Sequence, residues 1–373
     1  SETGAHTFGL IQSGRARLAI DGVIVIDGFA DPPPRGDAYF KLGSEEVTAE
    51  VELTAGAPVE ITIEYSSRDA VFVRGVRIGH RPPMAGDDLA RAERAAAEAD
   101  AVVLVVGTNA DWESEGEDRT TMDLPGEQDA LIRRVCAANP RTVVCVNAGS
   151  PVTMDWAERP AALLQTWFGG QEMGRALADV LFGAADPGGR LPLTIPLREE
   201  HSPSFGNVPG ENSTLRYGEG LLMGYRGFDT RRLPVRFPFG HGLSYATFEF
   251  GDPVLSSESF RAGERLGVEV PVTNTSEREG WVVLQAYVEP PRSALFRPHR
   301  ELRAFAKARL RAGERATLAL HFEERAFAYW DPGDPEHLAL REKLGPTADF
   351  VPAGGGVSHR ATPGWYADAG EYR

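Results

Sequence analysis

The sequence predicts a multidomain protein of α/β plus all-β class: a β-sandwich, then parallel-sheet α/β/α layers, then an immunoglobulin-like sandwich. Three observations predict this order. Apolar and polar residues alternate along the N-terminal runs, helical segments alternate with continuous apolar runs in the middle, and short turn-separated strands fill the C-terminal part. The predicted domains span residues 1–83, 84–249 (with a connecting segment at its end) and 250–373.

The first domain is predicted from runs of period-two alternation. Residues 17–21 and 59–65 alternate in this way, which indicates strands with one buried face. Asp21-Gly22 stands between two apolar runs and predicts a hairpin turn. Tyr39 and Phe40 follow a Pro-rich loop, and they are either sandwich core or exposed loop residues.

The second domain is predicted from helical segments that alternate with strands apolar on both faces, the pattern of parallel βαβ units. The helices are expected at residues 87–100, 126–138 and 172–182, and the strands at 101–107, 142–147 and 162–167. Three strands make a small parallel sheet, so we expect further strands to lie upstream of Ser1.

The third domain is predicted from four strands separated by turns, a spacing typical of a small immunoglobulin-like sandwich. These strands are expected at residues 266–273, 281–288, 305–310 and 316–322.

Composition excludes several classes of function. The formal net charge of −15 argues against nucleic acid or an anionic membrane as a partner, because both bind basic surfaces. No apolar run is long enough for a membrane span. The two cysteines, Cys136 and Cys145, are expected to be buried free thiols. Zinc-binding, dinucleotide-binding and P-loop motifs are absent, so we expect neither metal nor cofactor.

An acidic segment follows the first predicted parallel strand. Between Asp111 and Asp118, five of eight residues are carboxylates, and Arg119 comes next. Ligand sites form at the carboxyl ends of parallel strands. Because crowded carboxylates repel, we expect at least one of them to hold a proton near neutral pH, as a general acid requires. Trp112 could pack on the apolar face of a sugar. Charge alone favours the alternative, a solvated acidic loop, because runs of carboxylates usually lie on the surface.

Seven motifs in one order resemble glycoside hydrolase family 3, the family of β-glucosidases and β-xylosidases. They include Trp112-Glu113-Ser114-Glu115-Gly116-Glu117-Asp118-Arg119. The seven lie at residues 105–109, 112–119, 122–128, 147–152, 165–172, 186–194 and 237–245. The flanking residues also fit the family. Residues 1–83 resemble a protective-antigen-like sandwich that is incomplete at its start, and residues 250–373 resemble a fibronectin type III-like domain.

The resemblance implies hydrolysis of terminal β-linked sugars with retention, by two carboxylates roughly 5–5.5 Å apart and without a cofactor. The family's acid/base is a Glu of the α/β domain. The family pattern is a Glu, any three residues and an Arg. This pattern selects Glu115 as the acid/base, with Glu113 as the runner-up. The other glutamate would then hold Arg119 or a nearby backbone group. Trp112, Tyr39 and Phe40 are the implied substrate-binding residues.

The family's nucleophile is an Asp on an N-terminal (β/α)8-type barrel, for which residues 1–373 leave no room. We therefore expect a second polypeptide or a missing segment to supply it, and we expect this chain alone to be inactive. The implied substrate is a β-glucoside or a related oligosaccharide, aryl glycoside or natural-product glycoside. The alternative is a non-catalytic carbohydrate-binding or structural module derived from such an enzyme.

Overall fold

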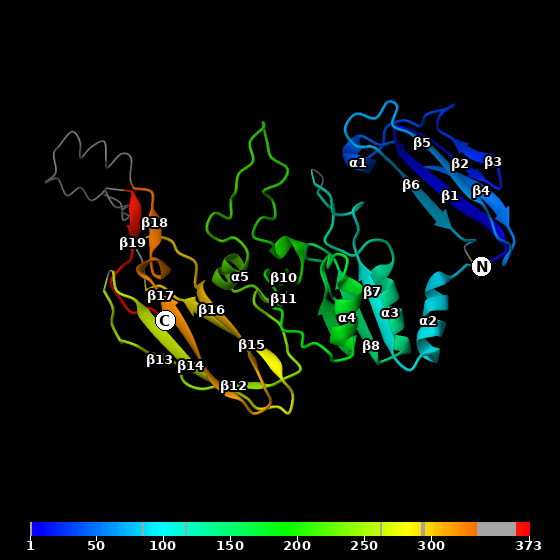
Figure 1. The fold of residues 1–373 in the computed structure, drawn as a ribbon. Helices are drawn as coiled ribbons and strands as arrows, with labels where there is room; N and C mark the ends of the chain where they lie inside the picture. The colour runs from blue at the N-terminus through cyan, green and yellow to red at the C-terminus, as the bar shows by residue number, and fades with distance from the viewer. Residues whose placement is uncertain (1, 84–85, 116–117, 262, 292–294, 334–362) are drawn as a thin grey trace, which may run out of the picture. The chain divides into compact units, whose positions relative to one another are not determined.

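The computed structural model describes residues 2–83, 86–115, 118–261, 263–291, 295–333 and 363–373 (Figure 1). The chain divides into two compact units. The first contains residues 1–120, 124–149 and 156–165, and the second contains residues 121–123, 150–155 and 166–373. Each unit is described by itself.

The first unit begins with an antiparallel β-sandwich, as the alternating runs predict. One sheet has the order β4-β1-β6 and the other β3-β2-β5. Asp21 and Gly22, with φ of 48° and 78°, form the predicted turn between β2 and β3. Phe8, Leu10, Leu18, Ile20 and Ile26 are buried in the shared core. The strands are β1 (Gly4–Ser13), β2 (Arg15–Ile20), β3 (Val23–Asp27), β4 (Val47–Leu53), β5 (Ile61–Ser66) and β6 (Gly75–Arg81).

Strand β5 departs from the prediction of one buried face. Its apolar residues Ile61, Ile63 and Tyr65 pair with β2 residues of the core, so they lie on the core side of the sheet. They are nevertheless 49%, 42% and 37% exposed, because β5 is an edge strand whose inner face is not covered by the described residues. The prediction failed because alternation shows which face is apolar, not whether another strand covers it.

A parallel sheet follows, with the order β7-β8-β9 (Figure 1). Its strands β7 (Val102–Gly107), β8 (Thr142–Asn147) and β9 (Ala162–Gln165) lie within one or two residues of their predicted bounds. So do the helices α2 (Asp88–Glu98) and α3 (Gln128–Ala138), which pack against each other. Asp87 accepts a hydrogen bond from the Ala90 N–H and so caps α2, which explains why this helix begins there.

Both cysteines are buried free thiols, as predicted. Burial raises the pKa of the Cys136 and Cys145 thiols, which lowers the thiolate fraction at any given pH. We expect both to react with Ellman's reagent at pH 8 much more slowly in the folded chain than in urea. Reaction at equal rates in the two states would contradict their burial.

The second unit contains the immunoglobulin-like sandwich, whose four predicted strands are all present. β14 (Leu266–Asn274) pairs with β17 (Arg315–Phe322), and β15 (Gly280–Val288) pairs with β16 (Glu301–Leu310). Buried residues of both pairs share one core, including Val272, Val282, Leu310 and Leu318. The predicted third helix is α4 (Met173–Leu181). The shorter elements, which the sequence did not predict, are β10 (Ile195–Pro196), α5 (Tyr225–Arg231), β11 (Val235–Phe237), β12 (Phe248–Phe250), β13 (Val254–Leu255), β18 (Tyr329–Asp331) and β19 (Gly364–Tyr366).

Asp186 joins the connecting segment to this sandwich. Its carboxylate accepts hydrogen bonds from the Ser244 hydroxyl (2.8 Å), the Tyr245 N–H (2.8 Å) and the Trp281 N–H (2.9 Å). Asp186→Ala leaves three donors without their acceptor, so we expect the free energy of unfolding to fall by roughly 2–4 kcal/mol in urea titrations. Alanine at the exposed Asp252 is the control, and an equal loss in both variants would contradict this role.

Within the described residues, no helix has the length and apolar character needed to cross a membrane.

Candidate active site

Residues 109–115, which include the described start of the acidic segment, form a compact turn at the carboxyl end of β7. The N–H groups of Trp112 and Glu113 both donate to the Asn109 carbonyl oxygen, at 3.0 and 2.9 Å. The Asp111 N–H donates to Asn109 Oδ1 at 2.9 Å. Asn109 therefore turns the chain sharply just after the strand, and the carboxylates are displayed at the edge where ligand sites form in parallel sheets.

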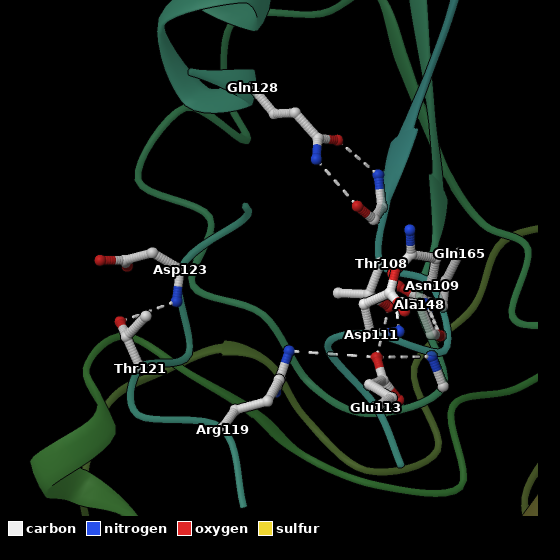
Figure 2. A network of polar contacts seen from close by, with 12 residues as sticks. Thr108, Asn109, Asp111, Glu113, Arg119, Thr121, Asp123, Gln128, Ala148 and Gln165 are labelled. Atoms are coloured by element: carbon white, nitrogen blue, oxygen red, sulfur yellow. Dashed lines mark hydrogen bonds and ion pairs between the residues drawn. The ribbon is translucent and has the colours of Figure 1, made fainter. Parts of the chain in front are cut away.

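Glu113 connects the ends of two strands (Figure 2). Its Oε1 accepts hydrogen bonds from Thr108 Oγ1, just after β7, and from the Gly149 N–H at 3.1 Å, just after β8. Arg119 Nη1 lies 4.0 Å from the same oxygen. The side chains of Glu113 and Arg119 are mostly buried, at 15% and 13% exposure. Glu113 thus fixes the start of the loop to the sheet. Its contact with Arg119 holds the other end of the loop at the same place.

Glu115 has the opposite environment. It is exposed, and among the described residues its carboxylate makes no hydrogen bond or ion pair. It stands between Glu113 and Arg119, the two points at which the loop is held. Glu117, a further acidic residue of the motif, lies outside the described residues.

Trp112 borders a cavity of about 290 Å³ at the end of β7. The Trp112 side chain is 41% exposed, so it is accessible to a ligand, as the sequence suggested. The lining consists of strand-end and loop residues: Val105, Val106, Gly107, Thr108, Asn109, Trp112, Pro125, Gln128 and Asn147. Thr108, Gln128 and Asn147 were not predicted as site residues; Thr108 and Asn147 stand at the ends of parallel strands, a position that could have indicated them.

Tyr39 and Phe40 lie in α1 (Ala38–Lys41), a short turn of the sandwich. Tyr39 is half-buried with the Arg77 guanidinium 5.0 Å from its ring centre, whereas Phe40 is 68% exposed. Phe40 is therefore not a core residue. Tyr39, Phe40 and Lys41 all have positive φ (56°, 59° and 64°), a strained state for residues other than glycine.

Among the residues that the structure describes, no group of three metal-ligating side chains is placed to hold a metal ion.

Comparison with known proteins identifies the family. Residues 19–245 match the glycosyl hydrolase family 3 C-terminal domain, which is more than half of the 373 residues. The chain belongs to glycosyl hydrolase family 3. Residues 282–337 match a fibronectin type III-like domain, in agreement with the predicted third domain.

The similar proteins are β-glucosidases. One from Rhizobium radiobacter is 40% identical over 338 residues, which cover 88% of this chain and 41% of the relative. The structure of a β-glucosidase from Kluyveromyces marxianus in complex with glucose has a TM-score of 0.78 at 35% identity, and the match covers 88% of this chain and 39% of that one. A Streptomyces venezuelae β-glucosidase in complex with D-glucose has a TM-score of 0.66 at 30% identity. The chain thus spans about 41% of the length of the curated relatives it matches, and none of the sheets among its described residues is a closed parallel barrel.

Proposed function

We propose that this chain supplies the acid/base glutamate, Glu115, of a retaining, exo-acting β-glycosidase that removes terminal β-linked glucose. The observation that carries the assignment is the contrast within one loop. Glu113 is held by Thr108 and Gly149, whereas Glu115 is exposed and its carboxylate makes no hydrogen bond to any of the described residues. A carboxyl group that must meet a substrate oxygen has to be accessible, and one that fixes a loop does not.

In the proposed reaction, an Asp carboxylate attacks the anomeric carbon while Glu115 protonates the departing glycosidic oxygen. The Asp comes from a separate polypeptide or from a segment outside residues 1–373. Glu115, now a carboxylate, then removes a proton from water as the water attacks the glycosyl-enzyme, which regenerates both groups. The chemistry needs no metal or organic cofactor.

The neighbouring residues have supporting roles in this proposal. Glu113 and Arg119 hold the loop so that Glu115 stays at its exposed turn. Trp112 offers an aromatic surface to a sugar ring beside the cavity. Phe40 is the better candidate of the two sandwich aromatics for substrate contact, because its ring is exposed while Tyr39 packs against Arg77.

The first test is turnover of 4-nitrophenyl β-D-glucoside by two proteins. One is the purified 373-residue chain, and the other is a hybrid in which this chain replaces the matched 41% of the R. radiobacter β-glucosidase. We expect the hybrid to be active and the chain alone to be inactive, because the nucleophile lies outside it. Robust turnover by the chain alone would contradict the shared site. A folded hybrid that binds glucose without turnover would favour the alternative, a carbohydrate-binding module.

A further inference from the structure

The second unit contains a cavity of about 420 Å³ beside strand β15. Val282 of this strand is buried in the sandwich core. Val283, Gln285 and Tyr287 alternate with the core residues, so they lie on the other face of the strand, where they line the cavity. Residues 238–241 of the connecting segment also line it. The volume falls within the roughly 300–1,000 Å³ that is usual for small-molecule sites.

Hydrogen bonds hold the polar side chains of this cavity in place. Gln285 Nε2 donates to the Gly240 carbonyl oxygen at 3.0 Å, and the Tyr287 hydroxyl donates to Gln285 Oε1 at 2.9 Å. Gly240 has φ of +81°, and a Cβ there would clash with Gln285 Oε1, so a glycine is needed for this close approach. Gln285 keeps one amide N–H, and the Tyr287 oxygen can still accept a hydrogen bond from a ligand.

His241 offers two further hydrogen-bonding atoms to the cavity. Its ring stacks on Phe237 with the centroids 5.1 Å apart, and within the described chain its ring nitrogens make no hydrogen bond. Burial and the nearby Arg190 lower the pKa of His241, so the imidazole is neutral at pH 7. A neutral imidazole has one N–H donor and one acceptor nitrogen. The cavity therefore presents both donors and acceptors without a charge at this position.

Arg300 is the one residue charged at neutral pH among the described residues that line the cavity, and no carboxylate is among them. Its charge is offset by Asp229, because Arg300 Nε lies 2.7 Å from Asp229 Oδ2. An anion would have to compete with that carboxylate, so an uncharged ligand suits the cavity better. Without a pair of carboxylates, the cavity can bind a glycoside but cannot hydrolyse it by the retaining mechanism.

Apolar side chains form the remaining part of the lining. They include Phe239, Phe250 and Val283. Phe250 is 46% exposed, so its ring is accessible to a ligand. A pyranose ring has an apolar face that packs on aromatic rings and a rim of hydroxyl groups that both donate and accept hydrogen bonds. The combination of an accessible aromatic ring with uncharged donors and acceptors is therefore suited to a sugar.

We propose that this cavity is a non-catalytic binding site for an uncharged pyranoside. The apolar face of the sugar would pack on Phe250, and its hydroxyl groups would bind His241, Gln285 and Tyr287. The site would hold a sugar in addition to the one that is cleaved beside Glu115. The site itself is inferred from the residues of the cavity, and only the choice of a glucoside as the test ligand rests on the proposed function.

The first experiment titrates the purified chain with methyl 1-thio-β-D-glucoside, which resists hydrolysis, and follows the backbone amide signals by NMR. We expect the signals of Gly240, His241 and Gln285 to shift and to saturate with a Kd in the millimolar range, because the ligand has only about 13 non-hydrogen atoms. D-Sorbitol has no ring face to stack, so it should bind at least about 10-fold more weakly.

Three results of this titration would overturn the proposal. The first is the absence of shifts at the cavity up to about 100 mM glucoside, including the case in which only signals near Trp112 shift. The second is binding of sorbitol as tightly as the glucoside, because a ring site must distinguish the two. The third is a response of the cavity signals to sodium sulfate without a response to the glucoside, which would show an anion site.

Two variants remove the proposed contacts. Phe250→Ala removes the exposed aromatic ring, and His241→Phe keeps a ring that can stack on Phe237 but removes both nitrogens. Each should raise the Kd at least about 5-fold, while the amide signals far from the cavity stay in place. Phe182→Ala, at a phenylalanine that is 89% exposed, is the matched control and should leave the Kd unchanged. If Phe250→Ala, at an exposed position, folds and keeps the original Kd, the proposed stacking is wrong.

The second experiment uses the hybrid described above and tests whether other polypeptide covers the cavity. The methyl signals of Val283 should shift on addition of the thioglucoside in the hybrid as they do in the chain. A folded hybrid in which they do not shift overturns the proposal. These readouts do not depend on turnover: an inactive hybrid with shifted Val283 signals contradicts the proposed function alone, and an active hybrid without the shift contradicts the sugar site alone.

Discussion

Replacing Gly107 with alanine is expected to lower the free energy of unfolding by roughly 2–5 kcal/mol and to displace the acidic loop. Gly107 has φ of +153°, which residues with a side chain rarely adopt. A Cβ at this position would lie 1.9 Å from the Asn147 carbonyl oxygen and 2.5 Å from its carbonyl carbon. Both atoms are backbone, so no side-chain rotation relieves the clash, and the ends of β7 and β8 must separate.

The control for this variant is Gly174→Ala in α4. There a Cβ would meet no atom within 4 Å and φ is not positive, so alanine should stabilise the helix by about 0.5–1 kcal/mol. Urea unfolding, monitored by circular dichroism, measures both variants. If Gly107→Ala is as stable as the original chain, the close approach of the two strand ends is wrong.

The effect on the loop can be separated from the effect on stability. The hydrogen bonds of Glu113 to Thr108 and Gly149 span the same two strand ends that Gly107 brings together. We therefore expect Gly107→Ala to increase exchange of the Gly149 amide even under conditions where the chain stays folded. A glycine in the strand thus controls where the acidic residues are held.

Much of the fold could be predicted because the periodicities are strong. The apolar run that became β8 and the Ala-rich segment that became α2 were placed within two residues of their observed bounds, since each has one dominant pattern. Very short strands such as β10 and β13 have two residues each, which is too few for any periodicity to show.

Burial was predicted less well than secondary structure. The run 101–107 is apolar throughout and predicted a strand buried on both faces, yet Val103 and Val105 are half exposed. Ile61 and Ile63 of β5 show the same discrepancy. A sequence pattern shows which environment suits a strand, and it does not show which faces of that strand the described residues cover.

The candidate site could also be predicted only in part from the sequence. Position in the sequence placed the acidic residues at the end of a parallel strand, which the structure confirms. It could not separate the environments of Glu113 and Glu115, because both are acidic residues of one loop, two positions apart. The separation depends on the Thr108 hydroxyl and the Gly149 N–H, which come from different strand ends and meet only in the folded chain.

Glu115→Gln in the hybrid enzyme is expected to reduce kcat/KM for methyl β-D-glucoside by roughly 10²–10⁴-fold, because the poor leaving group needs a proton as it departs. For 2,4-dinitrophenyl β-D-glucoside, the rate of the first step, formation of the glycosyl-enzyme, should fall far less, because that leaving group departs as a stable anion. Hydrolysis of the glycosyl-enzyme then becomes limiting, because no base activates the water. Added azide should restore turnover and give the β-glucosyl azide, since an anionic nucleophile needs no base.

Glu113→Gln is the matched control two residues away. Glutamine keeps the size of the side chain but weakens its acceptor role toward Thr108 and Gly149 and its attraction to Arg119. If Glu113 only positions the loop, its replacement should lower kcat/KM for both substrates by similar factors. Azide should then not restore the rate. If instead Glu113→Gln shows the leaving-group dependence and the azide product while Glu115→Gln does not, the two roles are reversed. Glu113 would then have to leave its strand-end partners to reach the substrate, and the loop geometry described above would be that of a resting state.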